Sequence, residues 1–350
     1  MGGNDMIQAN HDNEPPNTNI VAEIGLIVYP NCQMSAIYGL TDIFRVASDY
    51  ASKDGRGPAH AVRVSHWTPT DERMGCVFDS HPEAGEHHPS YLISPPSLVV
   101  PQQMKPADNQ LHHWLKHVKS QGTTLCGVCA GVFVLAEAGM LDNRDATTHW
   151  AFAEELARRY PKIRVDSSRM VIDAVDIITA AGILAWVDLG LTLVERLLGP
   201  SVMLHTSRFI LADPPRRQQS LYREFVPPMD HGDADILRAQ NHIHSHSDNQ
   251  LPIEHVAEIA QLQPRTLQRR FLKATGMSLA EYLLAIRIAE ARELLELTTL
   301  SVEQISRDVG YRDVSTFRKT FKRTTSITPT EYRNRFGIVS DHTSGSRQNR

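Results

Sequence analysis

Residues 123–138 read TTLCGVCAGVFVLAEA, and this stretch decides the fold of the N-terminal half of the chain. The β-prone residues from Thr123 to Val128 predict a buried strand, and the residues from Val132 to Ala138 predict a helix. Small residues flank Cys129 between the two, as a sharp strand-to-helix turn requires. A thiol at the start of a helix feels the helix dipole, so we expect a lowered pKa and an exposed, reactive side chain for Cys129.

Apolar runs alternate with helical patterns on both sides of this turn. The alternation predicts an α/β domain with a mainly parallel sheet over residues 20–211. The other predicted strands are Ile24–Tyr29, Val62–Trp67, Leu98–Val100 and Ile177–Thr179, and the other predicted helices are Ile37–Tyr50, Leu111–Lys119, Ala151–Tyr160 and Trp186–Leu198.

Two side chains are candidate partners for the cysteine at the turn. His149, in the run Thr147-Thr148-His149-Trp150, lies twenty residues after Cys129 and can bring an imidazole near the thiol. A thiol beside an imidazole is a nucleophile pair in outline. Cys126 and Cys129 have redox spacing, but Cys126 lies inside the predicted strand, which disfavours a redox pair.

The C-terminal part, from Ala234 to Phe336, shows only helical patterns, and its sequence repeats. The repeat predicts two helix-turn-helix units, each with a short helix that carries a small residue, Ala257 or Ser306, then a tight turn and a second helix. In the second copy Gly310 supplies the turn and Asp313 the helix cap. Leu267, Phe271, Gly276, Ser278, Glu281 and Tyr282 recur fifty residues later as Phe317, Phe321, Ser326, Thr328, Glu331 and Tyr332.

The second helix of each copy carries a basic, hydrogen-bonding face. Such side chains read base edges or grip phosphate, so the two faces predict contacts to double-stranded DNA in two adjacent major grooves, about 34 Å apart. The charge agrees, because residues 250–337 hold 14 Lys and Arg against 10 Asp and Glu, whereas the rest of the chain holds 22 against 30. A solvated helical face explains one copy alone, but it explains two poorly. The candidate DNA-binding residues are Arg265, Thr266, Gln268, Arg269, Ser315, Thr316, Arg318 and Lys319.

Both parts of the chain resemble known families. The runs Arg265–Phe271, Tyr282–Arg287, Asp308–Asp313 and Pro329–Arg333 make residues 234–337 similar to the DNA-binding domain of AraC/XylS transcription regulators. The runs Gly25–Tyr29, Gly39–Phe44, Gly127–Gly131, Leu135–Leu141, Thr148–Trp150, Ala180–Gly182 and Val187–Leu189 make the N-terminal part resemble the flavodoxin-like DJ-1/PfpI superfamily, which is related to class I glutamine amidotransferases. Their fusion resembles the GlxA-type regulators.

Two departures from the DJ-1/PfpI pattern argue against catalysis. The resemblance implies an acidic side chain six residues before Asp42, where this chain has Ala36, which cannot hold a proton. A second loop, which often gives N–H groups to an oxyanion, corresponds to Ser94–Ser97, and its two prolines have no N–H. The resemblance then implies a non-catalytic pocket for a small nitrogenous effector, such as an amino acid or a quaternary amine. The candidate pocket residues are Cys129, His149, Ala36 and Asp42.

Two further departures concern the AraC-like part. Gln263 stands where that family usually has a capping Ser, and Ser326 stands where it usually has Gly. A poor cap costs about 0.5–2 kcal/mol, so we expect weaker helix ends at both positions.

Three functions remain open at this point. The favoured one is a ligand-responsive transcription regulator and activator that needs no cofactor, forms a homodimer through its α/β domain and contacts RNA polymerase. The second is a DJ-1/PfpI-type enzyme, such as a hydratase, deglycase or amidase, that uses Cys129 and carries an accessory DNA-binding module. The third is an architectural DNA binder that senses nothing. The repeat favours DNA binding, and Ala36 with the proline pair disfavours catalysis.

Composition bounds these functions further. The chain has 350 residues, 22% of them charged, and four cysteines, which favours a cytoplasmic protein of two domains with reduced thiols and no membrane span. Residues 1–19 predict a flexible leader, 212–233 a proline-rich linker and 338–350 a flexible tail. His242, His244 and His246 alternate along a predicted helix and so face different ways, which favours a solvated helix end over a metal site.

Overall fold

The computed structural model describes residues 19–53, 60–71, 73–106, 109–215, 219–247 and 251–338. The predicted leader lies outside these residues except for Asn19, and the predicted tail lies outside them except for Ile338. The chain forms two compact units, Met1–Gln219 and Ser220–Arg350, which we call the N-terminal unit and the C-terminal unit. Their boundary falls inside the segment 212–233.

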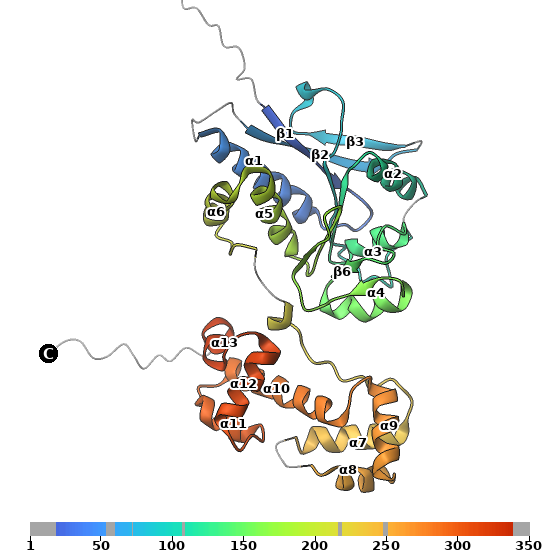
Figure 1. Ribbon diagram of the computed structural model, residues 1–350, viewed down its shortest axis with the longest axis vertical. Helices are drawn as coiled ribbons and strands as arrows, with labels where there is room; N and C mark the ends of the chain where they lie inside the picture. Colours follow the sequence, from blue (N-terminus) through green and yellow to red (C-terminus); the bar gives the residue numbers. More distant parts are fainter. Residues whose placement is uncertain are drawn as a thin grey trace, which may run out of the picture. The chain divides into compact units, whose positions relative to one another are not determined.

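The N-terminal unit is built on a seven-stranded sheet with the order β3-β2-β1-β4-β5-β9-β8 (Figure 1). Strands β2, β1, β4, β5 and β9 pair in parallel, and the edge strands β3 and β8 pair antiparallel. Along the chain the parallel strands have the order 2-1-3-4-5 of a flavodoxin-like sheet, so the predicted α/β class is confirmed. The strands are β1 (Asn19–Ile27), β2 (His60–Pro69), β3 (Met74–Asp79), β4 (Tyr91–Ser94), β5 (Thr124–Val128), β8 (Val171–Asp173) and β9 (Ile177–Ala180).

Helices cover both faces of this sheet (Figure 1). Helices α1, α5 and α6 pack together on one face, and α2 and α3 pack on the other. Between these layers the central strands bury fully apolar side chains such as Ile24, Leu26 and Leu125. The helices are α1 (Met34–Lys53), α2 (Asn109–Ser120), α3 (Gly131–Glu137), α4 (Ala153–Arg159), α5 (Ala185–Leu198) and α6 (Pro200–Phe209).

Several elements differ from the sequence prediction. Leu98–Val100 forms no strand; Leu98 and Val100 are exposed, and the strand that enters the sheet there is β4. The prolines on both sides of that run remove ladder donors, which apolar patterning does not show. The predicted helix Ala151–Tyr160 begins with a 3-10 turn, Trp150–Phe152, before α4. The antiparallel edge strands β3 and β8 are only six and three residues long, and they were not predicted.

The C-terminal unit is all-helical, as predicted (Figure 1). Its side chains form two cores, one around Phe271 and Tyr282 and the other around Phe321 and Tyr332. Helix α10 contributes to both cores and joins them. The helices are α7 (Ala234–Ser245), α8 (Ile253–Ala260), α9 (Pro264–Thr275), α10 (Leu279–Leu297), α11 (Val302–Asp308), α12 (Val314–Thr325) and α13 (Pro329–Phe336). No helix in the described residues of either unit is long and apolar enough to cross a membrane.

The sequence repeat of the C-terminal unit is visible in the structure as matching N-terminal caps of α10 and α13. Ser278 with Glu281 and Thr328 with Glu331 form capping boxes at the starts of α10 and α13. These caps fix where each helix begins by satisfying its first free N–H groups. Ser326, the departure from glycine, has a φ of 72° in the left-handed region, where its glycine counterpart in the first copy has 71°.

Candidate functional site

The cysteine turn lies where β5 ends and α3 begins. Cys129 has a φ of 53°, in the left-handed region, and its amide donates to the Ala180 carbonyl at 2.8 Å. Gly131 packs so tightly that an added Cβ would lie 2.2 Å from the carbonyl oxygen of Pro95. The predicted sharp strand-to-helix turn is therefore present, and glycine is required at its far side.

The thiol of Cys129 is buried and held in its neutral form. The residue is 3% exposed, and burial raises the pKa of its thiol to about 11. The backbone groups of Ala130 and Gly182 lower that pKa, but by less. The expectation of a lowered pKa and an exposed thiol is therefore wrong, because loss of solvent disfavours the thiolate more than the start of α3 favours it.

Residues after β1 cover the turn. The hydroxyl of Tyr29 donates to the Pro95 carbonyl at 2.6 Å, and its phenol interacts with the thiols of both Cys32 and Cys129. Burial raises the pKa of Tyr29, so it stays a neutral donor. The Pro96 carbonyl accepts from the Gln33 amide at 2.7 Å. These carbonyls come from the loop after β4, beside β1 where the strand order reverses, which is where sheets of this type bind ligands.

His149 lies near the turn without bonding to the thiol. Its Nδ1 accepts from the Ala151 amide at 3.2 Å, and its ring lies 5.3 Å from Trp150 and 5.2 Å from Phe152. Burial lowers the pKa of His149, so the imidazole is neutral at pH 7. The preceding residue, Thr148, does bond to the turn, because its hydroxyl donates to the Cys129 carbonyl at 2.7 Å.

Ala36 and Asp42 lie on different faces of α1. Ala36 is fully buried, whereas Asp42 is exposed and lines a groove of about 500 Å³ along α1, α5 and α6. Trp186 closes the groove by packing on Gly39, where an added Cβ would lie 2.4 Å from the indole ring. Of the four candidate pocket residues, Asp42 lines this groove, whereas Cys129, His149 and Ala36 do not.

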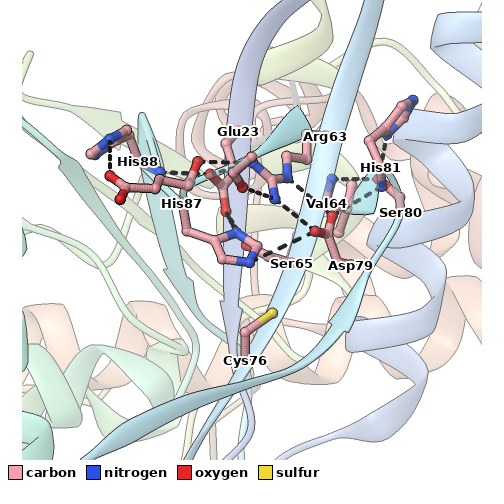
Figure 2. A network of polar contacts seen from close by, with 12 residues as sticks. Glu23, Arg63, Val64, Ser65, Cys76, Asp79, Ser80, His81, His87 and His88 are labelled. Carbon is pink, nitrogen blue, oxygen red and sulfur yellow. Dashed lines mark hydrogen bonds and ion pairs between the residues drawn. The ribbon is translucent and has the colours of Figure 1, made fainter. Parts of the chain in front are cut away.

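A buried ion network joins β1, β2 and β3 (Figure 2). Arg63, 3% exposed, donates to both carboxylate oxygens of Asp79 at 3.0 and 2.7 Å, and this bond lowers the pKa of Asp79. Glu23 accepts from Ser65 at 2.6 Å and lies 2.8 Å from His87 Nδ1. Figure 2 shows these groups pointing at one another, so the network ties the three strands together around the buried Arg63 guanidinium.

The histidines of α7 separate into two environments. His242 and His246 are four residues apart and stack at 4.4 Å, with His255 at 5.1 Å from His242. His244 faces the other way and lies 2.9 Å from the Tyr282 hydroxyl. The expectation that all three face different ways is therefore wrong for His242 and His246. Among the described residues no group of side chains suited to a metal ion is found.

The candidate DNA-binding faces lie on α9 and α12. Each helix buries one side, Leu267 and Phe271 in α9 and Phe317 and Phe321 in α12. The opposite side carries the candidate side chains: Arg265, Gln268, Arg269, Ser315, Thr316, Arg318 and Lys319 are exposed, and Thr266 is half-buried.

Two of these side chains have internal partners. The Thr316 hydroxyl donates to Asp313, which caps α12, at 2.6 Å. Arg318 forms an ion pair with Glu303 of α11 at 2.6 Å. Arg269 forms no hydrogen bond or ion pair with any residue that the structure describes. Neighbouring Arg270 has a structural role, because it binds Asp233 at 2.5 Å at the start of α7.

Sequence reasoning missed three residues around the cysteine turn. Tyr29 was assigned only to a strand, Thr148 only to a run with His149, and Gln219 to a linker. Gln219 is 2% exposed and bonds to Thr147, Thr148 and Trp150. Its proline-rich and arginine-rich surroundings gave no signal of burial.

Comparison with known proteins matches both parts. Residues 256–335 match the family model of a helix-turn-helix domain, and residues 100–196 match that of the DJ-1/PfpI family. The regulator GlxA of Rhizobium meliloti is 30% identical over 230 residues, which is 65% of this chain and 70% of that protein. CdhR of Pseudomonas aeruginosa is 30% identical over 224 residues, 64% of this chain and 66% of that one. The lactose operon transcription activator of Staphylococcus xylosus is 33% identical over 121 residues, 35% and 43% of the two chains.

A DJ-1/PfpI-type sheet domain in one chain with two helix-turn-helix units defines the class of HTH-type transcriptional regulators. The matched segment spans about two thirds of GlxA and CdhR. The chain belongs to the GlxA-type group of AraC/XylS-family transcriptional regulators.

Proposed function

We propose that the chain is a transcription activator whose N-terminal unit binds a small nitrogenous effector without turning it over. Its two helix-turn-helix units contact two adjacent major grooves of DNA. The observation that supports DNA binding is the exposed basic face of α9, which is repeated on α12. Similarity to a lactose operon transcription activator supports the activator role, with RNA polymerase as the further partner.

The chemistry at the cysteine turn supports binding rather than catalysis. With a thiol pKa of about 11, only about one Cys129 in 10⁴ is a thiolate at pH 7, and the thiolate is the nucleophile. Ala36 offers no group to move a proton. The carbonyls of Pro95 and Pro96 face Tyr29 and Gln33, so this loop presents acceptors where an oxyanion needs donors.

An aromatic face beside the turn suits a quaternary or protonated amine. The residues His149, Trp150 and Phe152 are half-buried. The His149 ring lies 5.3 Å from the Trp150 ring and 5.2 Å from the Phe152 ring. A cation over the face of an aromatic ring is stabilised by about 0.5–2 kcal/mol, depending on its exposure. A neutral His149 does not repel such a cation.

The groove along α1, α5 and α6 supports self-association of the N-terminal unit. Tyr38 on α1, Phe209 at the end of α6 and Leu211, two residues after that helix, are large apolar residues that are 58%, 63% and 93% exposed. Asp42 and Arg45 on the groove wall carry both signs of charge, so two copies related by a two-fold axis can pair them. Light scattering should show a dimer, which Phe209→Asp disrupts; a monomer at all concentrations would rule out this interface.

Thermal unfolding of the full chain tests effector binding. Choline is the cationic probe and 3,3-dimethyl-1-butanol its neutral counterpart of the same shape. A ligand at a hundred times its Kd stabilises the fold by about 2.7 kcal/mol, so choline should raise the Tm and the neutral compound should not. The shift should be lost in Trp150→Ala and kept in Phe209→Ala, an aromatic truncation in the groove.

Turnover assays test the non-catalytic part of the proposal. We expect no glyoxalase, amidase or isonitrile-hydrating activity from the wild type, and unchanged basal DNA binding in Cys129→Ala and Cys129→Ser. Turnover by the wild type that disappears in Cys129→Ala would establish an enzyme that also binds DNA.

A further inference from the structure

Helix α7 lies before the segment that matches the helix-turn-helix model, yet it packs against both helices of the first unit, α8 and α9 (Figure 1). Its start carries two acids that face α9. Asp233, the N-cap of α7, accepts two hydrogen bonds from Arg270 of α9, one from Nε at 3.0 Å and one from Nη2 at 2.5 Å. Asp235 lies 2.9 Å from Nη1 of the same guanidinium. All three guanidinium nitrogens of Arg270 are therefore held by the start of α7.

The same acids reach the turn between α8 and α9. Asp235 binds Arg238 at 2.6 Å, and Arg238 donates to the carbonyl of Ala260, the last residue of α8, at 3.2 Å. We call Asp233, Asp235, Arg238 and Arg270 the α7 clamp. The bonds from Arg270 lower the pKa of Asp233, so this pair is charged at pH 7. A forked, networked ion pair of this kind fixes direction as well as distance.

The second unit fixes its reading helix in another way. Asp313 caps the start of α12, whereas Gln263 makes no side-chain bond at the start of α9. Fifty residues after Arg270 the second copy has Thr320, which carries no charge and is 9% exposed. Helix α9 is therefore held near its middle by ion pairs, and α12 is held at its start by a cap.

Arg270 is the neighbour of Arg269, the candidate reading side chain. Successive residues of an α-helix point about 100° apart, so the direction of Arg270 sets the direction of Arg269. The apolar stripe of Leu267 and Phe271 alone sets this rotation loosely, because the hydrophobic effect is non-directional. Binding side chains have to be held within about 10–20° of their productive geometry. Loss of the clamp should therefore misdirect the reading face while α9 stays folded.

We propose that the α7 clamp positions the reading face of α9, so that Asp233 and Arg270 determine the DNA sequence preference without contacting a base. The inference rests on the proposed function, because it requires α9 to lie in a major groove. Plain electrostatics makes the opposite prediction. Asp233 is an acid, so removal of its charge should by itself strengthen binding to any DNA.

Asp233→Asn separates the two predictions, because Asn caps a helix about as well as Asp and carries no charge. Fluorescence anisotropy of the full chain gives the affinity for a duplex selected from a random library and for a scrambled duplex of the same composition. We expect the selected duplex to bind about threefold or more weakly, and the scrambled duplex to bind equally well or more tightly. Arg270→Lys keeps the charge and removes the fork, so it should lower the same preference.

Glu254→Gln is the matched control, since it removes the same charge from an exposed acid of α8. It should leave the ratio of the two affinities unchanged. Arg269→Ala supplies a readout that a purely structural role does not move. Its cost in affinity should be smaller in the Asp233→Asn chain than in the wild type, because a misdirected Arg269 contributes less. The cost of Arg318→Ala, in the second copy, should be the same in both chains.

Two results would overturn the clamp as a positioning device. One is tighter binding of Asp233→Asn to both duplexes alike, and the other is an equal cost of Arg269→Ala in both chains. If Asp233→Asn is unfolded at the assay temperature, Arg270→Lys takes its place and is judged by the same two comparisons. A wild type that does not distinguish the duplexes contradicts the proposed function itself, and the inference falls with it before any variant is compared.

Discussion

The two helix-turn-helix copies agree in their cores and differ at the ends of their reading helices. Phe271 meets Tyr282 edge to face at 5.1 Å, and Phe321 meets Tyr332 in the same way at 5.4 Å. Asp313 caps α12 through the amides of two residues, whereas Gln263 makes no side-chain bond to the start of α9. Packing inside each copy therefore tolerates little divergence, and the helix ends tolerate more.

The reading faces differ as well. Arg318 of the second copy is paired with Glu303, and Arg269 of the first copy has no ion pair in the described residues. A phosphate or base that takes Arg318 must replace an existing partner, so its net gain is smaller. We therefore expect the first copy to contribute the larger share of the DNA-binding affinity.

The largest expected effect concerns the shared core. Phe271→Ala and Phe321→Ala should each destabilise the C-terminal unit by about 3–5 kcal/mol, because both side chains are fully buried. Urea unfolding of the full chain measures this, with Leu272→Ala as the control, since Leu272 is 53% exposed. A clear difference between the losses in unfolding free energy caused by the two substitutions would show that the two copies are not packed equivalently.

The next effect concerns the reading faces. Arg269→Ala should weaken binding to a DNA site selected from a random library by about 1–3 kcal/mol if it reads a base. Arg318→Ala should cost less, and Glu303→Gln should raise affinity by releasing Arg318. Fluorescence anisotropy at two salt concentrations separates base from phosphate contacts, because loss of a phosphate contact lowers the salt slope by about one. A greater loss from Arg318→Ala than from Arg269→Ala would reverse the ranking.

Local chemistry explains how much of this the sequence predicted. The cap at Asp313 depends on residues within one helical turn, and it was predicted from the sequence. The capping boxes at Ser278 and Thr328 are equally local, but the sequence analysis identified these two residues only as members of the repeat. The turn at Cys129 is equally local and was predicted. Its thiol pKa was not, because the thiol is buried in the folded chain, where segments distant in sequence, such as those of Tyr29 and Pro95, cover the turn.

The same reasoning applies to two other failed predictions. Leu98–Val100 has strand-like composition, and its flanking prolines keep it out of the ladder. Gln219 is far in sequence from its partners Thr147 and Trp150, so no local pattern predicts its burial. Its glutamine side chain has the right donors and acceptor for the site, but only the folded chain shows which groups it meets.

A smaller effect is expected from exchanging the cap chemistry of the two copies. Gln263→Ser gives α9 the side-chain acceptor that it lacks and should stabilise the C-terminal unit by about 1 kcal/mol. Gln268→Ser, inside the same helix, is the control and should not stabilise, because Ser is a poorer helix former than Gln. Urea unfolding measures both. No gain from Gln263→Ser would mean that Pro264 at the first helical position already compensates for the missing cap.

The smallest expected effect is a pH dependence that distinguishes the two caps. Hydrogen bonds from the Thr316 hydroxyl and from the amides of Thr316 and Ser315 lower the pKa of Asp313 in the folded chain. Because the folded pKa lies below the unfolded value of about 3.9, the stabilisation is complete above that value and is lost as the pH falls through the folded pKa. Gln263 does not titrate, so the advantage of the second copy over the first should disappear in acid. Solvent screening at this exposed carboxylate keeps the effect small.

Asp313→Asn isolates this effect from every other titration in the chain. Asn caps a helix about as well as Asp but carries no charge, so it removes the pH dependence and keeps the geometry. Glu281 and Glu331 in the capping boxes also have a lowered pKa, but they titrate alike in both proteins and cancel in the difference. The Tm of the wild type should therefore approach that of Asp313→Asn, or fall below it, as the pH drops below about 4. Parallel Tm curves down to the acid limit of folding would mean that the Asp313 cap acts through geometry alone, and the two copies would then differ only in which residue supplies the cap.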